Sequence, residues 1–340
     1  MLSRGHWRRH NATLDPVRDH HEIYRTLMEL EFPWDMNQAL SFALFRTFAV
    51  PSIGGLLHET GEFEERPQKR YDDTALLLDE VLRHGMHTPN GRRAIRRVNQ
   101  MHGSFDITND DLRYVLSTFV VVPKRWLDDY GWRPMSRTEI EASAKYYVEL
   151  GRLMGIKDLP ATYSDFERLM DSYEAERFAF DTGGRRVADA TLALMASFYP
   201  AWAPMRMFSR ALMDEPLLAA LGYPVPPRLV VRAARGGLRL RGQLLRLAPS
   251  RRRPVRVQDL RRTRSYPDGF DVEAMGTFPR GSGGAEGGPA DGVRRRASRG
   301  RPARRSASST AASPTPPGRR RDGSSRRGRP ATLARLAARR

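Results

Sequence analysis

The sequence predicts an all-α fold, a single multi-helix domain followed by an Arg-rich tail. Every strongly periodic segment repeats its apolar residues at the spacing of a helix. Strand-like runs are few, and the most conspicuous β-branched cluster before residue 226, Val120-Val121-Val122, lies inside a helical pattern. Residues 281–340 consist almost entirely of Gly, Ala, Pro, Ser and Arg, a composition that cannot bury a core.

The tail also accounts for most of the basicity of the chain. Residues 281–340 hold 16 arginines against three acids, a net charge of +13, whereas the whole chain carries +19, so residues 1–280 carry only +6. The tail has no Phe, Trp, Tyr or Ile. We therefore predict an N-terminal extension at 1–19, a helical domain at 20–280 and a disordered basic tail at 281–340. The domain is long enough to enclose a cofactor.

The first part of the chain shows neither a secretory signal nor a membrane span. No apolar run follows the basic N-terminus, so a signal peptide is not expected. The longest weakly charged stretch, 38–57, is interrupted by Arg46 and Pro51, and we interpret it as two core helices. The expected location is cytoplasmic.

A helical hairpin follows. The pattern predicts one helix at 65–85 and another at 92–103, joined by a loop rich in Gly and Pro. Thr74 lies 11 residues before the loop segment 85–91, and His102 lies 11 residues after it. At a rise of about 1.5 Å per residue, both stand about 16 Å from the bend and can face each other.

The helices after the hairpin have recognisable starts. Thr108 or Asn109 caps a helix that runs towards Pro123, and its apolar face continues beyond that residue. Ser136 opens a capping box, with a Glu three residues on, for a helix that ends at Gly155. Further helical segments are expected at 163–180, 185–199, 202–213 and 216–221. The glycine pair 183–184 is expected to separate the first two of these.

The segment 226–254 is rich in Leu, Val and Arg and has two interpretations. It reads either as a basic amphipathic helix in weak peripheral contact with an anionic membrane, or as a last helix that packs its Leu face on the domain and leaves Arg in water. Gly236-Gly237 is expected to interrupt the helix, which favours the second interpretation.

The chain lacks the residues or motifs that several classes of protein function require. The chain has no cysteine, which excludes disulfides, thiolate haem ligation and Cys nucleophiles. It has no Glu-x-x-His of the di-iron bundles, no phosphate-binding Gly loop and no Gly-x-Ser-x-Gly. The basic tail has no aromatic residue to stack on bases, and only four Lys accompany 54 Arg in the chain, so nucleic-acid binding is disfavoured as a biological role.

Longer phrases around the hairpin resemble a known family. Arg70 and Thr74 form Arg-x-x-x-Thr, and with His102 they resemble the catalytic domain shared by bacterial latex-clearing rubber oxygenases and fungal MpaB-type oxygenases. Over about residues 20–280 the chain is similar to bacterial MpaB-like members. The phrases that carry the resemblance are Glu-Phe-Pro-Trp-Asp at 31–35, Lys-Arg-Tyr-Asp-Asp-Thr at 69–74, Asn-Gln-Met-His at 99–102, Asn-Asp-Asp at 109–111, Tyr-Val-Leu-Ser-Thr-Phe at 114–119 and Tyr-Gly-Trp-Arg-Pro at 130–134.

The resemblance implies an all-α domain that encloses haem b and uses dioxygen to cleave carbon–carbon double bonds in isoprenoid chains. It implies that His102 is the axial iron ligand and that Arg70 and Thr74 lie on the distal side, where Arg70 binds a haem propionate or polarises oxygen. An imidazole on one side of the iron, with a guanidinium and a hydroxyl on the other, suits a haem protein. The alternative is structural: Arg70 pairs with a nearby acid on the surface, and Thr74 bonds to the carbonyl of residue 70. Fungal relatives are described as membrane-bound, and this chain shows no equivalent anchor.

One residue departs from the family pattern. The rubber-cleaving branch has a Lys immediately before the Thr, where this chain has Asp73. An ionised Asp beside a haem repels a negatively charged oxygen ligand unless Arg70 pairs with it.

We therefore expect a haem b-dependent oxygenase that acts on an apolar, isoprenoid-like small molecule with dioxygen and an unidentified electron donor. The alternatives are a haem peroxidase-like or hydroxylating enzyme, and a non-enzymatic helical haem-binding or interaction module. Candidates for the lining of a substrate pocket, all of which suit a core equally well, are Phe42, Phe45, Phe48, Phe119, Trp126, Phe198 and Trp202.

Overall fold

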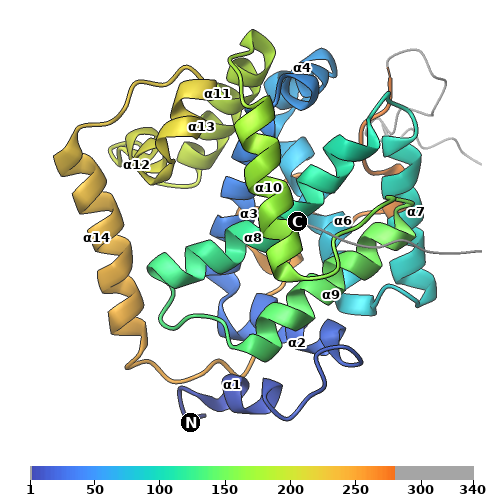
Figure 1. Cartoon of the computed structure of the whole chain (residues 1–340), viewed down its shortest axis with the longest axis vertical. Coiled ribbons are helices and arrows are strands. Elements are labelled where there is room, and N and C mark those ends of the chain that lie inside the picture. The colour runs from blue at the N-terminus through green and yellow to red at the C-terminus, as the bar shows by residue number, and fades with distance from the viewer. Residues whose placement is uncertain (1, 280–340) are drawn as a thin grey trace, which may run out of the picture. The chain divides into compact units, whose positions relative to one another are not determined.

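The computed structural model describes residues 2–279, which form helices and turns and, within that range, no sheet (Figure 1). The all-α prediction is confirmed, and the described residues belong to one compact unit. The predicted basic tail lies outside the described residues, and the boundaries drawn at 19/20 and 280/281 stay predictions. In chain order the helices are α1 (His6–Asn11), α2 (His20–Thr26), α3 (Pro33–Phe48), α4 (Pro51–Glu59), α5 (Glu62–Glu65), α6 (Pro67–His84), α7 (Pro89–His102), α8 (Asn109–Tyr130), α9 (Arg137–Leu153), α10 (Tyr163–Arg177), α11 (Thr182–Ser197), α12 (Met205–Leu212), α13 (Glu215–Ala220) and α14 (Arg228–Leu245).

The core lies between α3 and α8, which pack against each other near the centre of the unit (Figure 1). Helix α10 packs on α8, and α2 packs on α9. The largest fully buried side chains include Phe32, Phe45, Phe48 and Tyr114. These aromatic residues fill the space around α3 and α8 that the cavities described below do not occupy.

Local signals set the start of α8 and α9. The Thr108 side chain accepts a hydrogen bond from the Asp111 N–H at 3.1 Å, and Ser136 with Glu139 forms the predicted capping box. Helix α8 continues through Pro123 to Tyr130. Proline removes one donor from the helix, and burial of the apolar face on both sides of it outweighs that loss.

Two glycine pairs lie within helices, against expectation. Gly183 and Gly184 form the first turn of α11, where Asp181 caps the helix by accepting from the Gly184 N–H at 2.7 Å. A Cβ on Gly184 would lie 2.2 Å from the Phe48 carbonyl oxygen, so this glycine lets α11 approach the end of α3. Gly236-Gly237 lies inside an uninterrupted α14. The packing of Ala234, Leu238 and Gly242 against the domain outweighs the helix-breaking tendency of about 1 kcal/mol per glycine.

Buried ion pairs join segments far apart in sequence. Arg133 donates to Glu31 at 2.8 Å and to Glu139 at 2.7 Å, and all three side chains are buried. Asp35 accepts from Arg241 at 2.9 Å and from the Trp126 indole at 3.3 Å. Two of the phrases that carry the family resemblance, at 31–35 and 130–134, therefore fix the packing of the domain.

Residues 255–279, which we call the C-terminal strap, run along the hairpin of α6 and α7. Asp72 accepts from the Arg264 and Ser265 N–H groups at 3.0 and 2.9 Å. Arg97 on α7 donates to the Met275 carbonyl at 2.6 Å. The strap thus holds α6 and α7 together from outside.

No single helix within residues 2–279 has the length and apolar composition to cross a membrane. Taken together, α3 and α4 pass that test, and they are bent by 97° relative to each other.

Candidate active site

Two adjoining cavities lie beside the hairpin. The larger, of about 290 Å³, lies between α6, α7 and α8, and the smaller, of about 130 Å³, lies between α3, α6 and α9. The larger cavity brings together Arg70, Thr74 and His102, the three residues that the sequence singled out. Arg70 and Thr74 also line the smaller cavity, so they stand where the two meet. The residues shared by both linings are Leu44, Arg70, Thr74, Leu78, Phe119 and Leu150.

His102 ends α7 and presents a largely buried imidazole to the larger cavity. Within residues 2–279 its side chain makes no hydrogen bond or ion pair. Burial, and secondarily the positive charge of Arg70, lower the pKa of His102 to about 4. The imidazole is therefore neutral near pH 7 and has a lone pair available, which is the form that binds iron.

Arg70 and Thr74 form a pair one turn apart on α6. The Arg70 guanidinium donates to the Thr74 hydroxyl, which in turn donates to the Arg70 carbonyl at 3.1 Å. The guanidinium carbon lies 5.0 Å from the centre of the Phe63 ring. Burial lowers the pKa of Arg70, while the charges of Asp73 and Glu62 raise it. Arginine stays protonated in proteins, so this is a half-buried cation.

No carboxylate among the described residues forms an ion pair with Arg70. A buried charge without an ion-pair partner is costly, and an anionic group that enters the cavity relieves that cost. The guanidinium is therefore suited to a carboxylate or to an oxygen atom on which negative charge develops. The structural alternative for Thr74 is present at the same time, since its hydroxyl bonds to the carbonyl of residue 70.

Asp73 lines the larger cavity and does not pair with Arg70. Its carboxylate accepts from Lys69 at 2.6 Å, from the Tyr266 hydroxyl and from the Gly276 N–H at 3.0 Å. Lys69 lies four residues earlier on α6, the spacing at which helical side chains meet, and the strap supplies the other two donors. Asp73 therefore does not form the ion pair with Arg70 that the sequence left open, and three other donors stabilise its charge.

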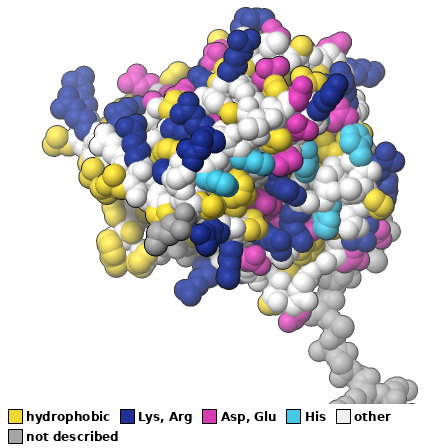
Figure 2. All heavy atoms as spheres, turned by 90° about the horizontal axis from the view of Figure 1, so that it is seen from below, with side chains coloured by type: hydrophobic (Ala, Val, Ile, Leu, Met, Phe, Trp, Pro, Cys, Tyr) yellow, Lys and Arg dark blue, Asp and Glu magenta, His cyan; other side chains and the backbone are white. Residues whose placement is uncertain are grey.

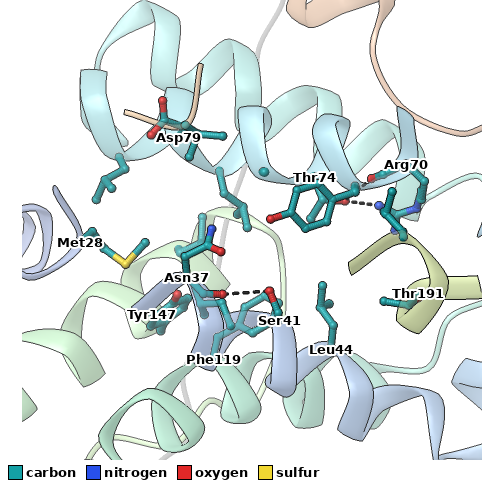
Figure 3. Close-up of a pocket in the computed structure, with 18 of the residues that line it drawn as sticks. Met28, Asn37, Ser41, Leu44, Arg70, Thr74, Asp79, Phe119, Tyr147 and Thr191 are labelled. Atoms are coloured by element: carbon teal, nitrogen blue, oxygen red, sulfur yellow. Dashed lines mark hydrogen bonds between the residues drawn. The ribbon is translucent and has the colours of Figure 1, made fainter. Parts of the chain in front are cut away.

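The smaller cavity is mainly apolar, and polar groups lie along it from Asp79 to Arg70 (Figure 3). Its polar residues include Asn37, Asp79 and the tyrosines of α2 and α9. The Tyr24 and Tyr147 hydroxyls hydrogen-bond to each other at 2.6 Å. Sequence reasoning missed Asp79. The available signal was the place of this carboxylate on the apolar stripe of α6, three residues after Leu76 and three residues before Leu82.

The predicted aromatic lining is confirmed only in part. Phe48 lines the smaller cavity, and Phe119 lines both. Phe42, Phe45 and Trp126 belong to the core, and the Phe198 ring lies against Tyr71 at a tilt of 53°, with ring centres 5.7 Å apart. Trp202 is 84% exposed, so its assignment to a pocket is wrong. It lies in a turn between α11 and α12 that leaves its ring in solvent.

No group of three or more His, Asp or Glu side chains within residues 2–279 is arranged to hold a metal ion. A haem iron needs only one or two ligands from the protein, because the porphyrin supplies the others. The neutral imidazole of His102, the unpaired guanidinium of Arg70 and the apolar walls between them fit the requirements of a haem.

Comparison with known proteins gives one family and several relatives. The family model described as "ER-bound oxygenase mpaB/B'/Rubber oxygenase, catalytic domain" matches residues 34–247. The chain is 33% identical over 230 residues to the ER-bound oxygenase mpaB of Penicillium brevicompactum, and the match covers 61% of this chain and 57% of that protein. It is 31% identical over 227 residues to mpaB' of the same fungus, covering 60% of this chain and 53% of that protein. It is 30% identical over 222 residues to the ER-bound oxygenase mpaB of Penicillium roqueforti, and the match covers 59% of this chain and 74% of that protein. The chain thus spans a little over half the length of the first two relatives.

Proposed function

We propose that this chain, which belongs to the family of MpaB and rubber oxygenase catalytic domains, is a haem b-dependent oxygenase that acts on an apolar, isoprenoid-like small molecule. The observation that carries the proposal is that one mainly apolar cavity brings together a neutral imidazole and a half-buried guanidinium, neither of which has an ion-pair partner within residues 2–279. Related proteins are named as oxygenases, which supports the class of reaction.

The residues of the larger cavity have separate tasks in this proposal. His102 would hold the iron, and Arg70 would bind a propionate or stabilise charge that develops on oxygen. Thr74, whose hydroxyl Arg70 already orients, would provide a second polar contact. Haem b, when bound, supplies the activation of dioxygen. Donors fixed in advance near a developing negative charge stabilise it without reorganisation.

The apolar walls bind the substrate and exclude water. The smaller cavity adjoins the larger at Arg70 and Thr74, so a chain lying in it would have one part beside the reacting groups. Leu44, Leu78 and Phe119 line both cavities and would orient that part. An electron donor acts from outside and is not identified.

We include weak peripheral membrane contact in the proposal. Leu229, Leu240 and Leu244 of α14 and Leu247 beyond it are more than half exposed, and α14 carries arginines between them. Hydrophobic and basic side chains lie side by side at the left edge of Figure 2, where α14 lies in Figure 1. Such a surface favours an anionic bilayer. Co-sedimentation with phosphatidylserine vesicles, lost when Leu240 and Leu244 are both changed to Ser, tests this part.

Product analysis tests the proposed reaction. The purified, haem-loaded protein is incubated with an isoprenoid, dioxygen and a chemical reductant, and the products are identified by mass spectrometry. Aldehyde or ketone fragments are expected from cleavage of a double bond. An intact hydroxylated chain would instead favour the hydroxylase alternative. If the protein takes up no haem and forms no product, the result would favour the alternative of a non-enzymatic module.

A further inference from the structure

The smaller cavity has a carboxylic acid at the end away from Arg70 (Figure 3). Asp79 and Thr74 both belong to α6 and are five residues apart, which separates them by about 7.5 Å along the helix axis. The lining between them consists mainly of apolar side chains, among them Leu44, Leu78 and Leu82. Asp79 lines the smaller cavity and is absent from the lining of the larger one.

Asp79 is buried, and no ion pair joins it to another of the described residues. Arg83, one turn further on, donates to Glu80 at 3.2 Å and to Gln258 at 2.9 Å, and so engages other partners. Burial raises the pKa of Asp79 to about 7, with Glu29 and Glu80 adding to the effect, while Arg83 and the Val257 N–H oppose it. Near neutral pH the group is thus divided between a carboxylate that accepts and a carboxyl that also donates.

The neighbouring helices place phenols at this end of the cavity. Tyr146 of α9 lies close enough to Asp79 for the two charges to interact, and its ring stacks on Tyr24 with centres 4.2 Å apart. Tyr24, Tyr146 and Tyr147 all line the cavity. This end is therefore polar, whereas the rest of the lining is mainly apolar, with Asn37 and Ser41 of α3 as polar residues between Asp79 and Arg70 (Figure 3).

We propose that Asp79 is a specificity-determining residue that binds the hydroxyl head of a short isoprenoid alcohol, whose tail extends along the apolar lining to Thr74 and Arg70. The identity of the tail rests on the proposed function. The bond that reacts then lies about 7.5 Å along the chain from the head, at the Thr74 end.

A hydroxyl head group suits this end of the cavity better than a hydrocarbon end or an amine. A hydrocarbon would offer the buried Asp79 carboxyl no hydrogen bond, and unmade hydrogen bonds of buried groups are costly. An amine would have to lose its hydration and would find an ionised partner only in part of the population. A hydroxyl donates to a carboxylate and accepts from a carboxyl, so it satisfies both forms of Asp79.

The test measures binding to the full-length protein by equilibrium dialysis. The probes are geraniol and its hydrocarbon analogue, in which hydrogen replaces the hydroxyl. The affinity ratio of alcohol to hydrocarbon is expected to fall about fivefold in Asp79→Leu, because one net hydrogen bond contributes about 1 kcal/mol. Asp110→Asn is the control, since Asp110 pairs with Arg113 at the start of α8 and lines neither cavity, and it should keep the wild-type ratio. An unchanged ratio in Asp79→Leu would overturn the proposal.

A second measurement uses the wild-type protein, should Asp79→Leu not fold. The affinity for geranate, which carries a carboxylate head, is expected to fall several-fold between pH 6 and 8 as Asp79 ionises, and this dependence should disappear in Asp79→Asn. A geranate affinity that does not change with pH, or that changes equally in Asp79→Asn, would overturn the proposal. The same assays on His102→Ala separate this inference from the haem proposal, because His102 does not line the smaller cavity and its loss should leave both results unchanged.

Discussion

Removal of the Asp73 carboxylate is expected to release the C-terminal strap from the hairpin. Asp73 is 3% exposed and accepts from Lys69, Tyr266 and Gly276, two of which belong to the strap. Removing one partner of a buried charged pair costs about 3–5 kcal/mol. In Asp73→Ala, exchange protection of the Gly276 amide should therefore fall by about 10² or more, because each 1.4 kcal/mol is a factor of ten. Hydrogen exchange followed by mass spectrometry measures this on peptides from residues 262–279.

Asp110→Ala is the control for that experiment. Asp110 pairs with Arg113 at the start of α8, and its side chain is 67% exposed. Exposed pairs of this kind contribute about 1 kcal/mol or less. Strap protection should be unchanged in Asp110→Ala. Equal protection of the strap in Asp73→Ala and wild type would show that these three hydrogen bonds do not hold it.

Three further predictions concern Arg70 and Thr74, the buried acid Asp79, and the tail at residues 281–340. If Arg70 and Thr74 act on oxygen and do not hold the haem, Arg70→Ala and Thr74→Ala should keep most of the haem and lose about 10²- to 10³-fold in turnover, as measured by product formation. Wild-type turnover in both variants would show that neither residue takes part in the reaction. The pKa of Asp79 is about 7 in the fold and about 4 when unfolded, so this group's contribution to stability is complete below pH 4 and is lost as pH rises through 7. The free energy of unfolding in urea, taken as Asp79→Asn minus wild type, should therefore rise by about 1–4 kcal/mol between pH 4 and pH 8. A difference between the two proteins that stays constant over this pH range would contradict the prediction. Deletion of residues 281–340 should leave the melting temperature nearly unchanged and reduce retention on heparin, given the net charge of +6 that remains, whereas a large fall in melting temperature would show that the tail stabilises the domain.

The hairpin was predictable because its signals are local. The apolar stripe of α6, the loop chemistry after it and the matched distances of Thr74 and His102 from the bend all come from residues close in sequence. The caps at Thr108 and Ser136 are local in the same way. Local signals fix the helices, and they also fixed which faces of α6 and α7 would meet.

The contacts that complete the site were not predictable, because they join distant segments. The strap has no periodicity, and the hydrogen bond from Gly276 to Asp73 depends on how it returns to α6. Asp79 lies on the apolar stripe of α6, but the sequence does not show that α3 and α9 enclose a cavity there. Packing also explains why α14 continues through its two glycines, although the helix propensity of glycine alone predicts a break there.

Haem content with and without the His102 imidazole tests the central claim most directly. The purified protein is reconstituted with haem b, and the haem-to-protein ratio and the absorption spectrum are compared for wild type, His102→Ala and His87→Ala. His87 lies in the loop of the same hairpin with a side chain that is 63% exposed, so it controls for loss of a histidine from this region. We predict stoichiometric haem in wild type and His87→Ala, and its loss in His102→Ala with the helical circular dichroism retained. Full haem content and an unchanged Soret band in His102→Ala would contradict the account.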